Sequence, residues 1–435
     1  MIVGIVGLGF VGLCFASVLA SKGYKVIGVD SDKQKIKSIK TGVPPFFEPK
    51  LGKLLKIALK KNFVVSTQIS YLNNCDFIFL TVGTPASKIG KIDLSIVKSA
   101  TEEIGELLKK VKTRPCIVVK STVVPNTTRN LILPILEKKS LKKVGKDFGL
   151  ITNPEFLRES KAIDDTTKPH LVVLGSARDK FLKKLEKLYR DFHPKVPIII
   201  TNYETAELIK YANNSFLATK ISFINQIANI CQVVPGTNVE DVARAIGYDP
   251  RIGKLFLNAG PGYGGSCLPK DVKALTNFAS SMGIKPTLLN AVEQVNKNQI
   301  KNIIKLIESV LGKFKQKNIS VLGIAFKPET DDIRDSVSID LIKLLLKKGA
   351  KIILHDPKAI ESAKNVFENK ISYASSIKGA LRNSHCCVIM TPWKQYSRIQ
   401  KNDLKVMKNR VVIDSRRLLI KNAAGIKYRA LGMGT

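Results

Sequence analysis

Short apolar runs alternate with stretches of helical periodicity over the first 200 residues of the chain. The runs are IVGIV (2–6), KVIGVD (25–30), FVVST (63–67), DFIFLTV (76–82), CIVVKSTV (116–123), FGLITN (148–153) and HLVVLG (170–175). Strands that are apolar along nearly their whole length and separated by helices are typical of a parallel sheet covered on both faces. We therefore expect an α/β domain here.

The pattern changes at about Thr205. Between residues 206 and 231 apolar residues recur at helical spacing, at 208, 209, 216, 217, 221, 224, 227 and 228. Helical character continues with breaks to about Leu311, and we predict no strand in this section.

Strand patterns return at residue 319 and repeat the opening of the chain. The segment NISVLGIAFK, a helix (338–349) and KIILHDP (351–357) match MIVGIVGLGF, a helix and GYKVIGVD, and in both copies an acidic residue follows the second strand. Further apolar runs follow at 385–393 and 410–417. We predict two Rossmann-like parallel-sheet domains (1–203 and 313–435) joined by a central all-helical domain (204–312).

The first glycine cluster has the spacing of a dinucleotide site. Gly7, Gly9 and Gly12 form GxGxxG between a strand and a helix, and Asp30 ends the next strand. The glycines allow a tight turn and a close approach of the backbone to a pyrophosphate, which the helix N-terminus also attracts. Asp30 would accept hydrogen bonds from ribose hydroxyls and repel a 2′-phosphate, which favours NAD over NADP. The alternative is a glycine-rich turn without a ligand.

Two later turns follow predicted strands, VGTP (82–85) and KSTVVP (120–125). Ligands of such sheets bind at the carboxyl ends of the strands. Small polar residues at these turns are candidates for contacts with nicotinamide and substrate, although ordinary loop chemistry explains them as well.

Two pairs of polar residues have a spacing of four. Glu155 and Glu159 would share a helix face, and by spacing alone a structural role, as residues near a capped helix start, is the favoured interpretation. Lys210 and Asn214 lie on the long predicted helix among mostly apolar neighbours, where a lysine is costly unless it is paired or used. They could hold a substrate hydroxyl and stabilise an oxyanion; a surface lysine with its stem along apolar residues is the alternative.

The stretch GPGYGGSCLPKD (260–271) presents a cysteine after a run of glycines. We expect Ser266 to cap a helix whose first turn contains Pro269, which would place Cys267 at the helix N-terminus. There the helix dipole and a nearby lysine favour the thiolate. Asp271 follows on the same face. A nucleophilic thiol beside a dinucleotide site suggests aldehyde chemistry, in which the thiol adds to a carbonyl and hydride loss gives a thioester.

Composition and charge exclude several other classes of protein. The seven cysteines are scattered and show no CxxC spacing, which argues against disulfides and structural zinc and fits a reducing cytoplasm. The formal charge is +36, but lysines are spread along amphipathic helices instead of forming one patch with aromatics, so we expect no nucleic-acid partner. No apolar run reaches the length of a membrane span, and we expect no membrane partner.

Together these motifs resemble the UDP-glucose/GDP-mannose dehydrogenase family. The resemblance rests on GLGFVG, VPPFFEP, TVGTP, KSTV, NPEFLRES, ELIKYANNSFLATKISFIN, DPRIG, GPGYGGSCLPKD, GIAFKPETDDIRDS and HDP. It implies an NAD-dependent four-electron oxidation of a sugar C6 alcohol to a carboxylate, with two NAD consumed. RIG (251–253) and the IKYANNSFLATKISF helix are more similar to the UDP-glucose branch, and the family implies a homodimer formed through the central helical domain.

The resemblance also implies catalytic roles. Cys267 is the expected nucleophile, and Glu155 is the expected base or water-activating group with Asp271 assisting. Lys210 and Asn214 are expected to stabilise the oxyanion.

Binding residues follow from the same resemblance, and no metal site is expected. Thr122 would position water and contact the cofactor. The expected NAD contacts are Gly7, Gly9, Phe10, Val11, Gly12, Asp30, Lys35, Thr84, Pro85, Thr122, Glu159 and Arg334. The expected substrate contacts are Glu155, Phe156, Leu157, Arg158, Lys210, Asn214, Arg251, Asn258, Tyr263, Gly264, Phe326, Lys327 and Arg416.

The chain departs from the family pattern at three places. Gln226 stands where glutamate is usual, Lys50 where glycine is usual, and VVPNTT (123–128) differs from the common VPVGT. Alternative activities are therefore a UDP-N-acetylhexosamine or GDP-mannose 6-dehydrogenase. A two-electron hydroxyacid dehydrogenase would need neither Cys267 nor a third domain, and a non-catalytic NAD-responsive or nucleic-acid-associated protein would need no catalytic residues.

Overall fold

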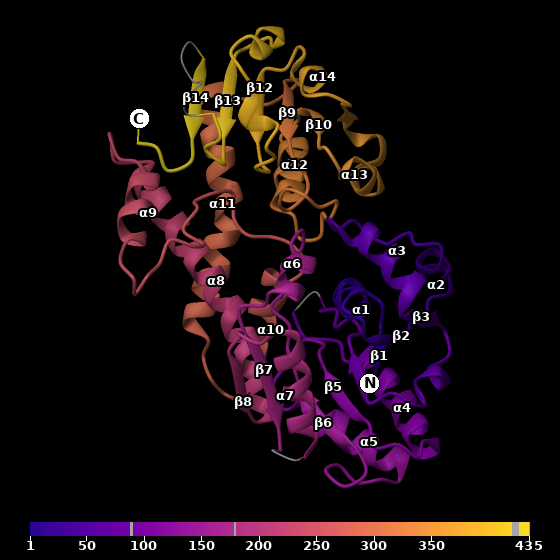
Figure 1. Cartoon of the computed structure of the whole chain (residues 1–435). Helices are drawn as coiled ribbons and strands as arrows, with labels where there is room; N and C mark the ends of the chain where they lie inside the picture. Colours follow the sequence, from indigo (N-terminus) through magenta and orange to yellow (C-terminus); the bar gives the residue numbers. More distant parts are fainter. Residues whose placement is uncertain (88–89, 178–179, 420–425, 435) are drawn as a thin grey trace. The chain divides into compact units, whose positions relative to one another are not determined.

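The computed structural model describes residues 1–87, 90–177, 180–419 and 426–434. By its internal contacts the chain divides into two compact units, residues 1–213 and 214–435. Figure 1 labels the helices and strands of both units along the chain.

The first unit is built on one sheet. In the described part of the chain this sheet has eight strands in the order β3-β2-β1-β4-β5-β6-β7-β8. The strands are β1 (Ile2–Val6), β2 (Lys25–Val29), β3 (Phe63–Ser66), β4 (Phe77–Leu80), β5 (Cys116–Val119), β6 (Gly149–Thr152), β7 (Val172–Ser176) and β8 (Ile198–Thr201). Each of the seven predicted runs contains or overlaps one of β1–β7, whereas β8 was not predicted. The expectation of a fully parallel sheet was wrong at one place, because β6 and β7 pair antiparallel.

Helices cover both faces of this sheet. They are α1 (Phe10–Ser21), α2 (Lys33–Lys40), α3 (Leu51–Lys61), α4 (Ser95–Lys110), α5 (Leu133–Ser140), α6 (Ala162–Thr167) and α7 (Lys180–Phe192). Alternate side chains of β4 show the two faces: Phe77 and Phe79 pack with residues of α1, α3 and α7, and Ile78 and Leu80 pack with residues of α4 and α5. Burial on both faces explains why the strand is apolar at every position.

The helical section begins with α8 (Tyr203–Cys231), which crosses the division between the units. It is followed by α9 (Val239–Gly247), α10 (Leu268–Ser281) and α11 (Thr287–Leu311). Gly312, with φ +69°, ends α11 in a conformation that favours glycine. As predicted, the described residues between 205 and 311 contain no named strand.

The second unit carries its own sheet, which in the described residues has the order β11-β10-β9-β12-β13-β14 and only parallel pairs. Its strands are β9 (Asn318–Leu322), β10 (Lys351–His355), β11 (Ser372–Tyr373), β12 (Cys386–Ile389), β13 (Val411–Asp414) and β14 (Lys427–Ala430). Helices α12 (Val337–Lys347), α13 (Ile360–Phe367) and α14 (Ile377–Leu381) belong to the same unit. The predicted second Rossmann-like domain is confirmed, although β11 and β14 were not foreseen.

The two sheets repeat one detail of the strand-turn-helix unit. After β2, Asp30 accepts a hydrogen bond from the Leu8 N–H, and after β10, Asp356 accepts from the N–H groups of Ile324 and Ala325. In the second unit the indole N–H of Trp393 also donates to Asp356. The acidic residue that ends each second strand therefore holds the glycine-containing turn of the first strand.

Candidate active site

The glycine turn of the first unit leaves room for a ligand at one glycine only. Gly7 has φ +96°, and a Cβ there would lie 2.9 Å from the Val82 backbone. A Cβ on Gly12 would lie 1.9 Å from the Gly7 carbonyl oxygen, whereas a Cβ on Gly9 would meet no atom within 4 Å. Gly7 and Gly12 are thus required by the fold itself, and the open space at Gly9 fits the approach of a pyrophosphate to the turn.

Asp30 is held at this turn by three donors. The N–H of Leu8 and the ammonium of Lys35 donate to Oδ2, each at 2.8 Å, and the N–H of Asp32 donates to Oδ1 at 3.0 Å. Its carboxylate is oriented before any ribose hydroxyl binds. The Lys35 ammonium thus lies beside the carboxylate that was predicted to favour NAD over NADP.

A cavity of about 740 Å³ opens beside the turn. Of the predicted cofactor residues, Gly7, Gly9, Asp30 and Lys35 line it. The other described lining residues are Val6, Val29, Ser31, Asp32, Thr67, Ile69, Thr81, Val82, Gly83, Ser95, Ile96, Ser99, Ala100 and Glu103. Those from α4 were missed, because nothing in the periodicity of a helix marks its first turns as a cavity wall. The size and the donor set fit a dinucleotide.

Glu155 lies in a loop and not on a helix. Residues 153–158 have no regular structure, so the helix on which Glu155 and Glu159 would share a face does not form. Glu155 is buried, its Oε1 pairs with the Lys210 ammonium at 3.1 Å, and its Oε2 accepts the N–H of Leu157. Lys210, on α8, is also buried and lies 5.4 Å from the centre of the Phe156 ring. The structure thus brings together a carboxylate and an ammonium that sequence analysis had considered separately.

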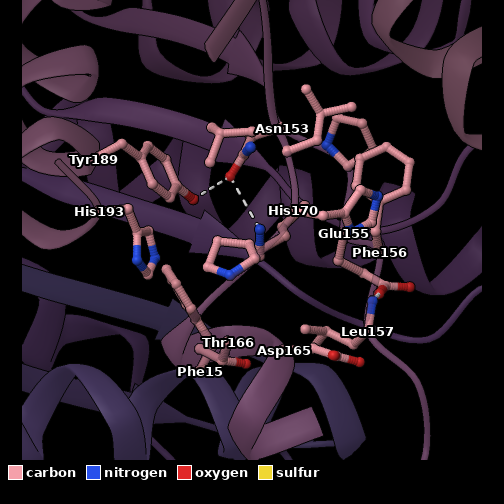
Figure 2. A pocket seen from close by; sticks show the side chains of 15 residues that line it. Phe15, Asn153, Glu155, Phe156, Leu157, Asp165, Thr166, His170, Tyr189 and His193 are labelled. Atoms are coloured by element: carbon pink, nitrogen blue, oxygen red, sulfur yellow. Dashed lines mark hydrogen bonds between the residues drawn. The ribbon is translucent and has the colours of Figure 1, made fainter. Parts of the chain in front are cut away.

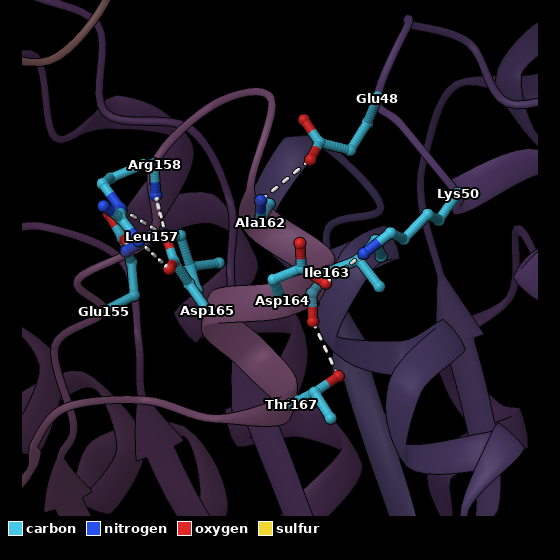
Figure 3. Close-up of polar contacts among 10 residues, drawn as sticks. All are labelled: Glu48, Lys50, Glu155, Leu157, Arg158, Ala162, Ile163, Asp164, Asp165 and Thr167. Carbon is cyan, nitrogen blue, oxygen red and sulfur yellow. Dashed lines mark hydrogen bonds and ion pairs between the residues drawn. The ribbon is translucent and has the colours of Figure 1, made fainter.

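A second carboxylate fixes the far end of the Glu155 loop. Glu48, 5% exposed, accepts the N–H groups of Ser160 and Ala162, each at 2.8 Å. Figure 3 shows the Glu48 carboxylate bonded to the N–H of Ala162, and it also shows the Arg158 guanidinium bonded to the Asp165 carboxylate. Arg158, a predicted substrate contact, is therefore already engaged by a carboxylate. Sequence analysis missed Glu48, although it stands in the VPPFFEP motif.

Lys50 explains one departure from the family pattern. Its φ of +70° lies in the left-handed region, which favours glycine, at the start of α3. Its ammonium pairs with Asp164 Oδ1 of α6 at 2.5 Å (Figure 3). The backbone conformation of Lys50 is therefore unfavourable for a lysine, but its side chain forms an ion pair that a glycine could not make.

In the second unit, Cys267 itself occupies the N-cap of α10. The prediction that Ser266 caps this helix was wrong, because the helix begins one residue later and its N-cap side chain makes no capping bond. Pro269 lies in the first turn as expected. None of the seven cysteines, all of which lie in the described part of the chain, forms a disulfide, and Cys267 is the one that is exposed. The remaining six are buried, as expected for small core residues.

Asp271, in the first turn of α10, joins two further polar groups. Its Oδ2 accepts the side-chain amide of Asn214 at 2.6 Å, and its Oδ1 pairs with Lys270 at 2.8 Å. Its N–H donates to the Cys267 carbonyl. Cys267 and Asp271 therefore share the N-terminal turn of α10, and Asn214 of α8 is bonded to this turn through Asp271.

The glycine-rich loop that precedes Cys267 is held by amide side chains. Asn225 Oδ1 accepts the Gly260 N–H, and Asn296 bonds both the N–H and the carbonyl of Tyr263. Gln299 donates to the Gly260 carbonyl. These bonds fix the loop backbone and bury Tyr263, whose pKa is raised by burial.

Residues that are distant in sequence line the same loop. A Cβ on Gly265 would lie 2.5 Å from the Phe326 ring, and one on Gly260 would lie 2.9 Å from the Arg416 guanidinium. The Gly265 N–H donates to the Arg334 carbonyl. Burial lowers the pKa of Arg416 to about 10, with Asp414 opposing the shift. Phe326 and Arg416, predicted as substrate contacts, and Arg334, predicted as a cofactor contact, thus all reach this loop.

The remaining predicted contacts are more exposed. Arg251 pairs with Asp249 at 2.7 Å in a turn whose carbonyls accept from Lys220 of α8. Asn258 is exposed, and the Lys327 ammonium lies 5.5 Å from the centre of the Phe326 ring. Among the described residues no group of His, Cys, Asp and Glu could hold a metal ion. No described helix is long and apolar enough to cross a membrane.

Family models match the chain in three successive segments. The NAD binding domain of the UDP-glucose/GDP-mannose dehydrogenase family matches residues 1–193, its central domain residues 204–298 and its UDP binding domain residues 320–421. The chain belongs to this family. The glycine turn, Asp30 and the cavity beside them lie in the NAD binding domain, and NAD is the cofactor of this dehydrogenase.

Individual relatives cover the whole dehydrogenase. UDP-glucose 6-dehydrogenase TuaD of Bacillus subtilis is 41% identical and aligns with 99% of this chain and 93% of its own length. The structure of a UDP-glucose dehydrogenase from Pyrobaculum islandicum superimposes with a TM-score of 0.93 at 32% identity, covering 99% and 98% of the two chains. A UDP-D-ManNAc dehydrogenase from Pyrococcus horikoshii gives 0.87 at 26% identity, covering 99% of each chain.

Proposed function

We propose that this dehydrogenase oxidises the C6 alcohol of UDP-glucose to the carboxylate of UDP-glucuronate. The observation that carries the proposal is the exposed Cys267 at the N-cap of α10, in the turn that also contains Asp271, to which Asn214 of α8 donates. A simple alcohol dehydrogenase needs no thiol, whereas a four-electron oxidation needs a group that retains the aldehyde. The names of the UDP-glucose dehydrogenase relatives support the choice of substrate.

The reaction requires two hydride losses and one hydrolysis. NAD, when bound, supplies the hydride acceptor for each oxidation. In the first oxidation the C6 hydroxyl loses its proton to a base and C6 becomes an aldehyde. The Cys267 thiolate then adds to C6, the adduct loses the second hydride to become a thioester, and water cleaves the C–S bond to release carboxylate and thiol.

The buried pair in the first unit suits the proton transfers. Glu155 can accept a proton from the hydroxyl or from the attacking water, because its carboxylate is held by Lys210 and by the Leu157 N–H. The Lys210 ammonium can stabilise the developing oxyanion, with Asn214 as a second donor. Thr122, which follows β5, is the proposed residue for positioning water.

Binding of the nucleotide sugar is proposed to involve the glycine-rich loop of the second unit. The loop is fixed by Asn225, Asn296 and Gln299, and it contacts Phe326 and Arg416. The bound nucleotide would meet a preformed backbone instead of ordering a mobile one. The remaining predicted contacts keep their proposed roles: Phe10, Val11, Thr84, Pro85, Glu159 and Arg334 for NAD, and Phe156, Leu157, Arg158, Arg251, Asn258, Gly264 and Lys327 for the sugar nucleotide.

The decisive assay measures NADH formation with UDP-glucose, UDP-N-acetylmannosamine and GDP-mannose. We expect two NADH per sugar and the highest kcat/KM with UDP-glucose. A preference for the N-acetylhexosamine, the substrate class named for the Pyrococcus relative, would transfer the same chemistry to another sugar. Absence of NADH with every nucleotide sugar would refute the proposal.

Cys267→Ala tests the covalent step. Without the thiol, the aldehyde is not held covalently in the site. Uronate formation should then fall at least about 1,000-fold, because the variant loses the rate advantage of a nucleophile held next to the aldehyde. Product analysis by mass spectrometry with matched thermal unfolding would separate this loss from misfolding. Unchanged uronate output would exclude the thioester.

A homodimer is also proposed, and one face of α8 supports it. Phe216, Phe223 and Ile230 are exposed (65%, 52% and 50%) at intervals of seven residues, which places them on one stripe of the helix. A stripe of large apolar side chains is typical of an interface between helices. Light scattering should give twice the chain mass of 47.9 kDa and, for Phe223→Lys, the chain mass itself. A wild-type monomer would refute this interface.

We place the enzyme in the cytoplasm, because Cys267 must remain a thiol and none of the seven described cysteines forms a disulfide. Cell fractionation tests this location, and recovery outside the cytoplasmic fraction would contradict it.

A further inference from the structure

Lys120 is a buried lysine that the proposed catalytic group does not include. It follows β5 directly, is 7% exposed, and lies with its ammonium 5.0 Å from the centre of the Phe15 ring. Among the described residues its ammonium has one hydrogen-bond acceptor, Asn153 Oδ1 at 3.0 Å, and no carboxylate at ion-pair distance. A buried charge without a direct counter-charge is costly, so its presence requires a reason.

Asn153 connects this lysine to the loop that carries Glu155. Its side-chain oxygen accepts from Lys120 and from the Tyr189 hydroxyl, and its amide nitrogen donates to the Val173 carbonyl at 2.9 Å. Figure 2 shows the Tyr189 hydroxyl directed at Asn153 within the pocket that Glu155 also lines. Asn153 directly follows β6, and Glu155 comes two residues later, so the orientation of Asn153 sets the start of the loop.

We propose that Lys120 is a positioning residue for Glu155, acting through Asn153 by its hydrogen bond and on the carboxylate by its charge. The proposal rests on the proposed function, in which Glu155 is the base. The ammonium holds the Asn153 oxygen while Tyr189 holds it from α7, and the turn into Pro154 and Glu155 is thereby fixed at its first residue. Attraction to the Glu155 carboxylate favours the ammonium form of Lys120.

The groups that face Lys120 come from three other elements. Burial lowers the pKa of Lys120 to about 8, Glu155 of the loop after β6 opposes this shift, and Lys210 of α8 adds to it. On α7, burial raises the pKa of Tyr189 and lowers that of His193 to about 4. Tyr189 and His193 therefore stay neutral between pH 6.5 and 9.5, and Lys120 loses its proton within that range.

The direction of the pH effect follows from these charges. The charge of Lys120 belongs to the ammonium form, so its contribution is present below the pKa of Lys120 and is lost as pH rises through it, whereas the neutral amine can still donate to Asn153. Lys120→Met removes the charge at every pH and keeps the apolar stem. The ratio of wild-type to Met-variant kcat should be roughly tenfold at pH 6.5, as for other residues that orient a reacting group, and should be smaller at pH 9.5, where only the hydrogen bond to Asn153 distinguishes the two proteins.

Tyr189→Phe is the matched control, because it removes the other donor to Asn153 without removing a charge. Its ratio to the wild type should be the same at pH 6.5 and pH 9.5, and KM for the nucleotide sugar should change little in either variant. Thermal unfolding of both variants should resemble that of the wild type, since methionine fills the stem volume of lysine.

Three outcomes would overturn the inference. The first is a ratio of wild-type to Lys120→Met kcat that does not depend on pH, and the second is a ratio near one at every pH. The third is a Met variant that fails to fold, which would show that the lysine has a structural role. A wild type that forms no NADH from any nucleotide sugar would refute the proposed function instead, so the two failures are distinguishable.

Discussion

Replacing Lys50 by glycine and by alanine separates backbone strain from an ion pair. A left-handed conformation costs a non-glycine residue about 1–2 kcal/mol, and Lys50 has φ +70°. Replacement by glycine relieves this strain, but it also increases the conformational freedom of the unfolded chain, which lowers the free energy of unfolding by about 0.4–1 kcal/mol. The pair with Asp164 joins side chains that are 63% and 58% exposed, so it contributes at most about 1 kcal/mol.

These terms predict an order of stability. Lys50→Ala keeps the strain and loses the pair, so its free energy of unfolding should fall by up to about 1 kcal/mol. The free energy of unfolding of Lys50→Gly should be higher than that of Lys50→Ala by about 0.5–1 kcal/mol. This difference is the relieved backbone strain minus the entropic cost of glycine in the unfolded chain. Urea unfolding followed by circular dichroism measures both differences, provided the slopes agree.

The Asp164→Asn background provides the control. There the wild-type lysine and Lys50→Ala should become equal in stability, whereas the gap between the glycine and alanine variants should persist. A glycine variant no more stable than the alanine variant would refute the strain argument.

The first of two further predictions concerns the choice of cofactor. Asp30→Ser removes the carboxylate that repels a 2′-phosphate and leaves Lys35 to attract it. Loss of the ribose hydrogen bonds, about 1–3 kcal/mol, should lower kcat/KM for NAD roughly 10–100-fold and raise the ratio of NADP to NAD use; an unchanged ratio measured by steady-state kinetics would contradict this role. The second concerns Glu207, whose pKa burial raises from 4.5 to about 7. The neutral form of Glu207 stabilises the fold below pH 4.5, and this contribution is lost as pH rises to 7. The free energy of unfolding of the wild type minus that of Glu207→Gln should therefore fall by about 3 kcal/mol across this range. If chemical denaturation gives a difference that does not change with pH, the burial argument is contradicted.

Much of the fold follows from the sequence because the sheets are buried on both faces. The repeated pattern of strand, glycine turn, helix and terminal aspartate predicted both Rossmann-like units, and Asp30 and Asp356 take equivalent places. The direction of β7 was not predictable, because an apolar run such as VVLGS reads the same in parallel and antiparallel pairing. The short β8 follows a proline and lies at the sheet edge, where its periodicity is weak.

The site was predicted in its residues and only partly in its geometry. Spacing suggested a helix for Glu155 and Glu159, but bonds from Glu48 to the backbone N–H groups of Ser160 and Ala162 hold this segment as a loop. Such contacts join residues more than 100 positions apart, and no local pattern encodes them. The roles of Lys120 and Asn153 likewise depend on the meeting of β5 with β6.

The burial of six cysteines and the exposure of Cys267 have a practical consequence for counting working molecules. A thiol-directed alkylating reagent applied to the native enzyme should incorporate one label per chain, and the uptake should equal the concentration of competent sites. Loss of NADH production against label incorporated then gives a straight line that ends at one equivalent. Because the other six cysteines are buried, this titration would measure Cys267 and provide an internal standard of enzyme quality.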